Sequence, residues 1–337
     1  VIYVGTAQGL EADIVPKAGL PFRTITARGL KRRIAAQNLW SLALALKGVA
    51  EAIRLVRAVR PRVVIGTGGY VSGPVLLAAT LCRVPFLVHE QNAFPGLTNR
   101  LFARSAGYVA LTFPEATRFL PPGARIKVTG LPVREEIRRA DRERARAQLN
   151  VGEETVILSF GGSRGAQRLN RAVAGLFSVF GGKTGVRLYH ATGTAGYDEF
   201  RELLGSKGID LANLPNATVV PYFYNIADYL AAADLVICRA GAATIAELTC
   251  LGRPAILVPY PHATANHQEF NARALAAQGA AVVIRDAALT PERLVVEVKR
   301  LLSSPTVLRD MAARSAGLGK PEALEQIIAC IKEIGHL

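Results

Sequence analysis

Short apolar runs rich in β-branched residues alternate along this chain with longer segments in which apolar residues recur every three or four positions. The short runs predict buried strands, and the longer periodic segments predict helices. Strands that alternate with helices form parallel sheets covered by helices on both faces. The predicted strands are 1–4, 63–65, 85–89, 108–111, 127–129, 156–160, 186–191, 218–220, 235–238, 255–259 and 281–284.

The 337 residues are enough for about two domains of ordinary size. The charged segment 133–152 contains no predicted strand, and we expect it to link two α/β domains. We predict an N-terminal domain over 1–133 and a C-terminal domain over 134–317, with the segment 318–337 forming a helix that returns to the first domain. Because ligands bind at the carboxyl ends of strands in open α/β folds, two such sheets predict a cleft there.

Charge is distributed unevenly along the chain. Residues 1–147 hold 23 Lys and Arg against 9 Asp and Glu, whereas the remainder holds 18 against 17. The basic first half indicates an anionic partner, for which nucleic acid and an anionic membrane are both candidates, or a merely solvated basic face. The longest strongly apolar run, 39–46, is far shorter than the roughly 20 residues that span a bilayer. The four cysteines are scattered without a CxxC motif, which is typical of reduced thiols.

Glycine-rich turns follow predicted strands in both halves. They read VVIGTGGYVSG at 63–73 and ILSFGGSRGAQRLN at 157–170, each as strand, turn and helix. Bare backbone N–H groups and a helix N-terminus in such turns can face an anion. Neither turn is a P-loop or a GxGxxG motif, and a tight turn without ligand explains either one alone. Together, one in each half, they favour a phosphorylated ligand.

A third turn, LVICRAGAATIAEL, leads into a helix that we expect to begin near Ala242 or Ala243. Its helix N-terminus can accept a phosphate. Glu247 lies about one turn into this helix, where its carboxylate would repel phosphate and suit a neutral diol such as ribose. The alternative is an ordinary solvated glutamate.

Polar side chains gather after two further strands. HEQNAFPGLTNR at 89–100 brings His89, Glu90, Gln91 and Asn92 to a strand end. The side-chain amides of Gln91 and Asn92 suit sugar recognition. His89 could equally be a buried structural histidine. The second cluster, PYPHATANHQEFNA at 259–272, has two histidines but no third ligand at metal-binding spacing.

No Asp-x-Asp occurs anywhere in the chain, so a metal-bound diphosphate is not indicated. Arg134, Arg164 and Arg239 lie nearest these turns, and with backbone dipoles they would meet the charge of a leaving phosphate.

Taken together and in order, these motifs resemble the MurG family of peptidoglycan N-acetylglucosaminyltransferases, and the resemblance covers nearly the whole chain. It implies an α/β GT-B fold with two Rossmann-like doubly wound parallel-sheet domains facing across a cleft. It implies inverting, cofactor-free and metal-independent transfer of N-acetylglucosamine from UDP-N-acetylglucosamine to the muramoyl 4-hydroxyl of lipid I, giving lipid II and UDP. The segments that carry it are GTAQGLEADIVPKAG, GTGGYVSGP, HEQNAFPGLTN, VTGLPVR, FGGSRGAQRLN, ADLVICRAGAATIAEL and HQEFNA.

The resemblance also implies roles for individual residues. Glu247 would bind the ribose, while Ser163 and Arg134 would lie at the diphosphate. Gln268 would contact the donor sugar, Phe223 the uracil through its backbone, and Asn92 the sugar from the first domain. The nucleotide would be lined by Ala242, Ala243, Thr244, Ile245 and Ala246. The remaining implied site residues are Gly68, Gly69, Tyr70, His89, Glu90, Asn99, Asn170, Arg239 and Asn271.

One part of the family pattern is missing from the sequence. The family begins with a strand and a GGTGGH loop, and neither precedes Val1 here. The histidine of that loop is a leading candidate for the base that deprotonates the acceptor hydroxyl. We therefore expect a first domain truncated at its start, with His89, Glu90 and Tyr70 as the remaining catalytic candidates. A catalytically impaired nucleotide-sugar binder and another lipid glycosyltransferase are the alternative functions.

The predicted helix around residues 39–56 suggests where a membrane could bind. We expect one face to be the core stripe, formed by Leu39, Leu42, Leu46, Val49, Ile53 and Val56. The opposite face would carry Trp40, Leu44, Lys47, Arg54 and Leu55, just after the basic run GLKRR. Cations interleaved with apolar residues suit an anionic membrane surface. The family resemblance then implies a peripheral protein on the cytoplasmic face of the bacterial inner membrane. The alternative is that Trp40 packs under a loop. A nucleic-acid partner is not expected, because no basic and aromatic platform for bases is present.

Overall fold

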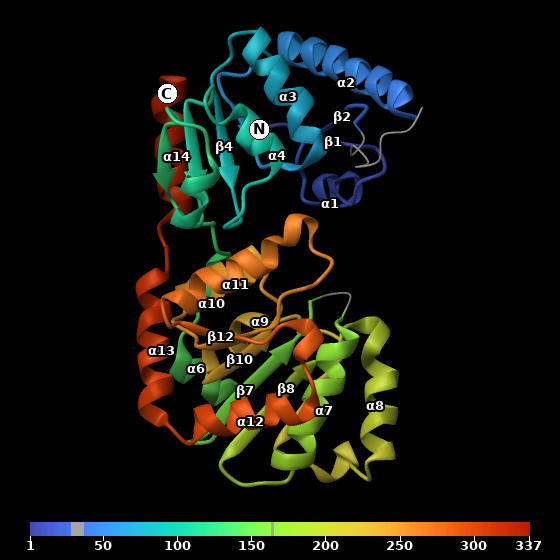
Figure 1. The fold of residues 1–337 in the computed structure, drawn as a ribbon, viewed down its shortest axis with the longest axis vertical. Coiled ribbons are helices and arrows are strands. Elements are labelled where there is room, and N and C mark those ends of the chain that lie inside the picture. Colours follow the sequence, from blue (N-terminus) through green and yellow to red (C-terminus); the bar gives the residue numbers. More distant parts are fainter. Residues whose placement is uncertain (28–36, 163–164) are drawn as a thin grey trace. The chain divides into compact units, whose positions relative to one another are not determined.

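The chain forms two compact units. The computed structural model describes residues 1–27, 37–162 and 165–337, with the side chains of 37–43 outside the description. Unit 1 comprises Val1–Thr129 and Glu325–Leu337, and unit 2 comprises Gly130–Leu324 (Figure 1). From sequence we placed the boundary at 133/134 and the start of the returning segment at 318.

Unit 1 is built on parallel strands. β1 (Tyr3–Gly5) pairs with β2 (Phe22–Thr24), and a separate sheet has the order β3-β4-β5-β6. These four strands are β3 (Val64–Gly66), β4 (Phe86–Glu90), β5 (Tyr108–Leu111) and β6 (Ile126–Val128). The helices of this unit are α1 (Glu11–Lys17), α2 (Gln37–Val59), α3 (Gly69–Leu81), α4 (Leu97–Phe102), the 3-10 turn η1 (Pro114–Phe119) and α14 (Ala323–Gly335).

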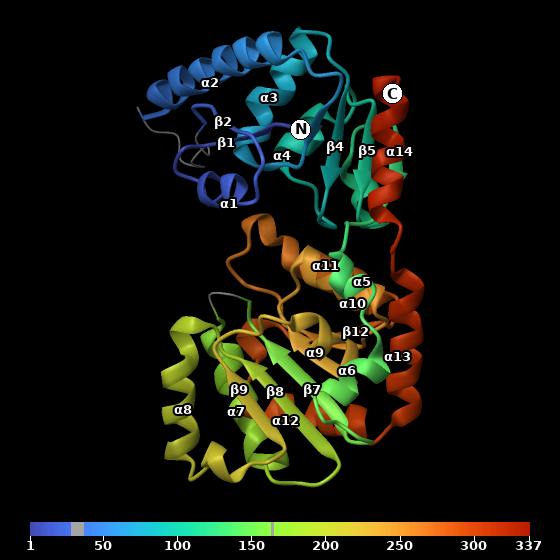
Figure 2. The same ribbon diagram turned by 180° about the vertical axis from the view of Figure 1, so that it is seen from behind.

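The last helix of the chain, α14, packs on the sheet of unit 1. Successive β4 side chains point to opposite faces, so Phe86 and Val88 pack in one hydrophobic cluster with α3, while Leu87 packs in another with α14 (Figure 2). Gly107 allows this approach, because a Cβ there would lie 2.7 Å from Ile334 Cγ2. Tyr108 Oη also donates a hydrogen bond to Glu333 Oε2 at 2.9 Å.

Unit 2 is a larger parallel sheet with the order β12-β11-β10-β7-β8-β9. Its strands are β7 (Thr155–Phe160), β8 (Val186–Ala191), β9 (Ala217–Val220), β10 (Leu235–Cys238), β11 (Ala255–Leu257) and β12 (Ala281–Val283). Its α-helices are α5 (Glu135–Arg138), α6 (Arg142–Gln148), α7 (Gln167–Phe180), α8 (Tyr197–Ser206), α9 (Ile226–Ala232), α10 (Ala242–Cys250), α11 (His267–Ala277), α12 (Pro291–Leu302) and α13 (Pro305–Leu318). Its 3-10 turns are η2 (Thr194–Gly196), η3 (Leu211–Asn213), η4 (Thr264–Asn266) and η5 (Asp286–Ala288).

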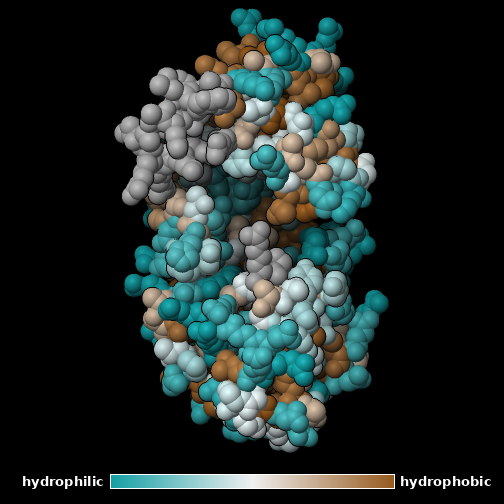
Figure 3. Space-filling view, turned by 90° about the vertical axis from the view of Figure 1, so that its right-hand side faces the viewer, coloured by the Kyte–Doolittle hydropathy of each residue, from teal (hydrophilic) through white to brown (hydrophobic). Residues whose placement is uncertain are grey.

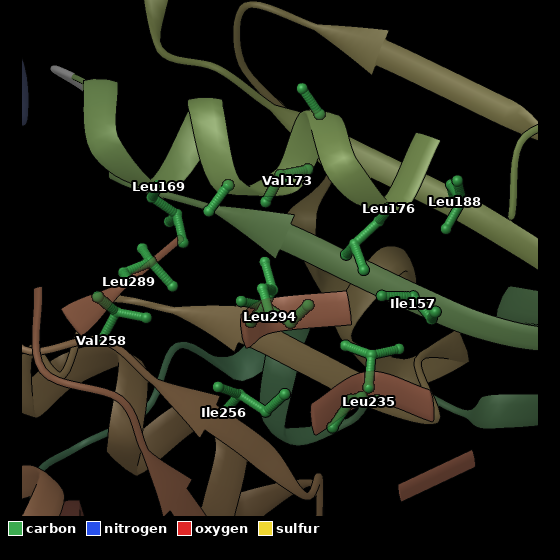
Figure 4. Packing of buried hydrophobic residues seen from close by; sticks show 14 of the residues in the cluster. Ile157, Leu169, Val173, Leu176, Leu188, Leu235, Ile256, Val258, Leu289 and Leu294 are labelled. Atoms are coloured by element: carbon green, nitrogen blue, oxygen red, sulfur yellow. The ribbon is translucent and has the colours of Figure 1, made fainter. Parts of the chain in front are cut away.

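The main core of unit 2 lies between the sheet and the pair α7 and α12. Figure 4 shows Leu169, Val173 and Leu176 of α7 directed toward the strand side chain Ile157, with Leu294 of α12 beside them. All five side chains are almost fully buried. Burial of one such side chain contributes roughly 1.5–3 kcal/mol, so this interface is a main source of stability in unit 2.

Every predicted strand is present, with ends shifted by at most two residues. The sequence analysis missed β2, whose residues Phe22, Arg23 and Thr24 are half-buried or exposed and give no apolar run. It was also wrong to treat 133–152 as a linker. This segment contains α5 and α6, and Ala145 of α6 packs against Ala231 and Ala232 of α9. The linker interpretation failed because arginine-rich helices can bury a narrow alanine face.

The core stripe predicted for α2 was wrong at Leu46. Its side chain is 64% exposed, whereas Gly48, Ala52 and Val56 face inward. The reason is the close approach at Gly48, where a Cβ would lie only 2.0 Å from the carbonyl oxygen of Thr26. Residue 46 then points away, since two helical steps rotate by about 200°.

The predicted outer face of α2 also needs correction. Leu55 packs partly against the core instead of facing outward, and Leu44 is half-buried. Lys47 is exposed as expected and lies 3.8 Å from Glu51. The side chains of Leu39, Trp40 and Leu42 lie outside the description.

Candidate active site

In unit 2, the predicted polar and glycine-rich segments all follow the carboxyl ends of parallel strands. Residues 161–162 and 165–166 follow β7, residues 239–241 follow β10, and residues 258–266 follow β11. Because β11, β10 and β7 are consecutive neighbours in one parallel sheet, these segments gather at one edge. This edge is where ligands bind in such folds.

The turn after β7 is fixed to the end of β8. Gly165 has φ +76°, and a Cβ there would lie 2.4 Å from the carbonyl oxygen of Thr192. Asn170 is buried, and its Nδ2 donates a hydrogen bond to the same oxygen at 2.9 Å. Asn170 therefore shapes this turn from within. Ser163 and Arg164, which we expected at the phosphates, lie outside the described residues.

The helix after β10 begins at Ala242, one of the two positions near which the sequence predicted its start. Ile245 and Ala246 bury their side chains, whereas Ala243 is exposed and Ala242 and Thr244 are half-buried. Ile245 and Ala246 could therefore contact a nucleotide only through their backbone.

Glu247 lies in the second turn of α10 with a side chain that is 18% exposed. Arg134 Nη2 lies 3.5 Å from Glu247 Oε1, so the structure brings these two predicted site residues together. Burial raises the pKa of Glu247, and the positive charge of Arg134 acts against this rise. Arg134 is half-exposed and also lies 3.0 Å from Glu136 Oε1, which leaves it at the surface end of the cluster.

Arg239, directly after β10, is already paired. Its Nη1 lies 2.6 Å from Asp286 Oδ1 and donates to the carbonyl oxygens of Val258 and Pro259 at 3.2 Å. It therefore clamps the ends of β10 and β11 to η5, and its charge is balanced within the fold. The sequence analysis missed Asp286, whose one available signal was a lone acid shortly after the strand 281–284.

The polar cluster after β11 also binds its own backbone. Gln268 Oε1 accepts a hydrogen bond from Tyr260 N at 2.8 Å, and the buried Asn271 donates from Nδ2 to Ala240 O at 3.2 Å. These bonds join the start of α11 to the segments after β10 and β11. Within residues 1–27, 37–162 and 165–337, no group of three or more His, Cys, Asp or Glu is placed to hold a metal ion.

Phe223, in the segment after β9, is buried, and its ring centroid lies 4.1 Å from that of Tyr229. Any contact it makes with a ligand must come from its backbone, which is the role that the resemblance implied.

In unit 1, the segments GTGGYVSG and HEQN contain the carboxyl ends of the neighbouring strands β3 and β4 and the residues that follow them. Gly68 and Gly69 have φ of +89° and +78°. A Cβ on Gly68 would lie 3.3 Å from Asn99 Nδ2, and Thr98 Oγ1 donates to Gly69 O at 3.0 Å. The two segments therefore meet through α4. Tyr70, next in the turn, is 49% exposed.

The end of β4 is tightly bonded. His89 and Glu90 are buried, and the carbonyl oxygen of His89 accepts from Gln91 Nε2 at 3.2 Å and from Asn99 Nδ2 at 3.4 Å. Glu90 accepts a hydrogen bond from the backbone N–H of Asn92 at 2.9 Å. Four of the predicted residues, His89, Glu90, Asn92 and Asn99, thus form one hydrogen-bonded cluster.

Two protein-family models match this chain. The Glycosyltransferase family 28 C-terminal domain matches residues 156–327, and the Glycosyltransferase family 28 N-terminal domain matches residues 1–111. The chain belongs to glycosyltransferase family 28. The two matched ranges fall on the two units and contain all the site residues described above except Arg134.

Curated family 28 relatives are similar over almost the whole chain. The protein named UDP-N-acetylglucosamine–N-acetylmuramyl-(pentapeptide) pyrophosphoryl-undecaprenol N-acetylglucosamine transferase from Desulforudis audaxviator is 53% identical over 335 residues, covering 99% of this chain and 90% of the relative. The protein of the same name from Moorella thermoacetica is 51% identical over 332 residues, covering 98% and 90%. The resemblance to the MurG family is therefore confirmed.

Solved structures agree with this family 28 assignment. The crystal structure of Acinetobacter baumannii MurG has a TM-score of 0.79 at 29% identity, covering 99% of this chain and 91% of that one. The UDP-GlcNAc 2-epimerase from Neisseria meningitidis has a TM-score of 0.64 at 11% identity, covering 99% and 91%, and shows likeness of fold alone. The predicted α/β GT-B class, with two Rossmann-like parallel-sheet domains, is confirmed.

Proposed function

We propose that this glycosyltransferase moves N-acetylglucosamine from UDP-N-acetylglucosamine to the muramoyl 4-hydroxyl of lipid I, which yields lipid II for peptidoglycan. The observation that carries this proposal is the 53% identity, over 99% of the chain, to a relative named for that transfer. In the reaction, the acceptor oxygen bonds to the anomeric carbon as the bond from that carbon to the UDP oxygen breaks. The electron pair of that bond leaves with UDP, the hydroxyl proton passes to a base, and the anomeric centre inverts.

The edge of unit 2 is suited to the donor. A half-buried carboxylate such as Glu247 can accept hydrogen bonds from both hydroxyls of a ribose diol, and Arg134 beside it favours the ionised form. The N-terminus of α10 and Arg134 would meet the charge that gathers on the departing diphosphate. Gln268 and the backbone of Phe223 would complete the contacts with sugar and uracil.

The polar end of the unit 1 sheet is proposed to hold the acceptor. Asn92 is half-buried and offers its amide to a sugar hydroxyl, whereas the buried Asn99 supports the loop from within. Gly68 and Gly69 expose backbone to the acceptor diphosphate at the start of α3. Tyr70 is exposed at the same turn and could contact the acceptor directly.

UDP release provides the test of the transfer. Release should require both UDP-N-acetylglucosamine and a lipid I analogue, and diacylglycerol should not replace the analogue. Release with diacylglycerol would favour the other lipid glycosyltransferase. Binding of UDP without release under any acceptor condition would favour a nucleotide-sugar binder.

We also propose that unit 1 binds an anionic membrane surface peripherally, at the cytoplasmic face of the inner membrane. Unit 1 holds 18 Lys and Arg against 7 Asp and Glu, a net charge of +11. The contacting helices α3 and α4 each carry two exposed leucines four residues apart, Leu77 with Leu81 and Leu97 with Leu101. Figure 3 shows brown apolar areas beside teal polar ones on the upper unit. Among the described helices, none has the length and hydrophobicity needed to cross a bilayer.

Vesicle co-sedimentation tests the membrane proposal. Replacing Leu81 and Leu101 by Ser should weaken binding to phosphatidylglycerol vesicles, and Trp40→Ala with Lys47→Glu tests the site expected from sequence. Leu10→Ser, which changes another exposed leucine of unit 1, is the matched control. Unchanged binding of both test variants would refute the proposal.

A further inference from the structure

Glu90, the last residue of β4, has both carboxylate oxygens occupied inside the fold. Glu90 is buried, with 2% of its surface exposed. Oε1 accepts from Asn92 N at 2.9 Å and from Asn92 Nδ2 at 3.4 Å. Oε2 accepts from Gly96 N at 2.9 Å and from Asn99 Nδ2 at 2.7 Å. All four partners are N–H donors.

Four donors match the capacity of a carboxylate, which offers about four lone-pair positions. A buried carboxylate without such donors would lose the solvation that water provides, and here the donors replace that water.

The bonds of Glu90 connect parts of the acceptor side that are separate in sequence. Through Asn92 and Gly96 they fold the loop 91–96 around the carboxylate. Through Asn99 they reach the turn after β3, since a Cβ on Gly68 would lie within 3.3 Å of that same amide. One side chain therefore sets the shape of both segments proposed to hold the acceptor.

We infer that Glu90 is a positioning residue for the acceptor loop and does not serve as the base. A base must direct an open lone pair at the hydroxyl that it deprotonates, and the four N–H donors leave Glu90 none. The inference rests on the proposed transferase function and deepens it. It assigns Glu90 to acceptor binding through Asn92 and the Gly68–Gly69 turn.

Two variants of Glu90 and one control test this role. Glu90→Gln keeps the size of the side chain but turns one oxygen into a donor that faces N–H groups, and Glu90→Asp keeps the charge on a shorter stem. Glu51→Gln is the matched control, since Glu51 also holds a unit 1 loop through Thr26 N at 2.6 Å, but that loop follows β2 and not β3 or β4. Hydrogen exchange of residues 91–99, acceptor KM, kcat and their pH profiles would be measured.

A positioning role predicts a specific set of results. In Glu90→Gln, exchange across 91–99 should speed up about 10-fold or more, with exchange in α10 unchanged. The acceptor KM should rise about 10-fold or more, the donor KM should stay the same, and the acidic limb of kcat/KM should remain. Glu90→Asp should recover part of the acceptor affinity and loop protection lost in Glu90→Gln. Glu51→Gln should resemble wild type in hydrogen exchange of residues 91–99 and in acceptor KM.

The opposite pattern would overturn the inference. If Glu90 were the base, Glu90→Gln would lower kcat by about 100-fold or more and abolish the acidic limb, while loop exchange and acceptor KM stayed unchanged. Absence of turnover in wild type would count against the proposed function instead. In that case the exchange experiment, together with direct binding of the lipid I analogue, would still decide the role of Glu90.

Discussion

His190 provides a quantitative prediction about the stability of unit 2. It lies on β8 with no exposed surface, and its Nδ1 is 2.9 Å from Ser159 Oγ on the neighbouring strand β7. The ring centroid of Phe200 lies 4.7 Å from that of His190, and Nε2 has no hydrogen-bond partner. Burial lowers the pKa of His190 from 6.5 to about 3, and the hydrogen bond to the backbone of Ser159 opposes this only partly.

The direction of the pH effect on the free energy of unfolding follows from the protonation of His190 in the folded and unfolded states. Above pH 6.5 the imidazole is neutral in both folded and unfolded protein, so its contribution to stability does not change. As pH falls from 6.5 toward 3, the unfolded chain binds a proton that the folded chain cannot, and the free energy of unfolding decreases. With these pKa values the loss between pH 7 and pH 5 is about 2 kcal/mol.

The test compares His190→Leu with wild type in urea unfolding at pH 7, 6 and 5, followed by circular dichroism. Native-state hydrogen exchange of β8 would assign the transition to unit 2. The variant should lose about 2 kcal/mol less than wild type between pH 7 and 5. His262→Leu, which removes an exposed imidazole, is the control and should keep the wild-type slope. An equal slope in His190→Leu and wild type would refute the reasoning.

Three further perturbations have defined outcomes. Gly48→Ala should destabilise unit 1 by about 1–3 kcal/mol in thermal unfolding, because its Cβ would overlap the carbonyl of Thr26, and an unchanged melting temperature would contradict this. Gly165→Ala should weaken UDP binding in calorimetry, because φ +76° and the Thr192 carbonyl both disfavour a Cβ, and wild-type affinity would show that the turn tolerates one. Glu247→Gln should raise the Kd for UDP about 10-fold or more, since hydrogen bonds to a charged group contribute about 1.5–3 kcal/mol. Because burial raises the pKa of Glu247, wild-type affinity should also fall on acidification above the usual carboxyl range, and a similar fall in Glu247→Gln would exclude this carboxylate as the cause.

The sequence by itself determined the elements and the edges at which the site lies. Apolar periodicity located the strands, and parallel topology then required HEQN, GTGGYVSG and the turn before Glu247 to lie at carboxyl ends. The sequence also predicted the start of α10 near Ala242 or Ala243, where the apolar strand run gives way to an alanine-rich stretch. These features depend on the local pattern of apolar and polar residues, which can be read directly from the sequence.

Only the tertiary structure decided which polar groups are already satisfied. Glu90 and Arg239 looked like groups available to substrate, yet one holds four N–H donors and the other is paired with Asp286. The direction of Leu46 likewise depended on the contact between Gly48 and Thr26. The contacts that decide these outcomes join residues from 2 to 47 positions apart in the chain, from Glu90 with Asn92 to Arg239 with Asp286. The period of a helix or strand carries no information about which of these groups will meet.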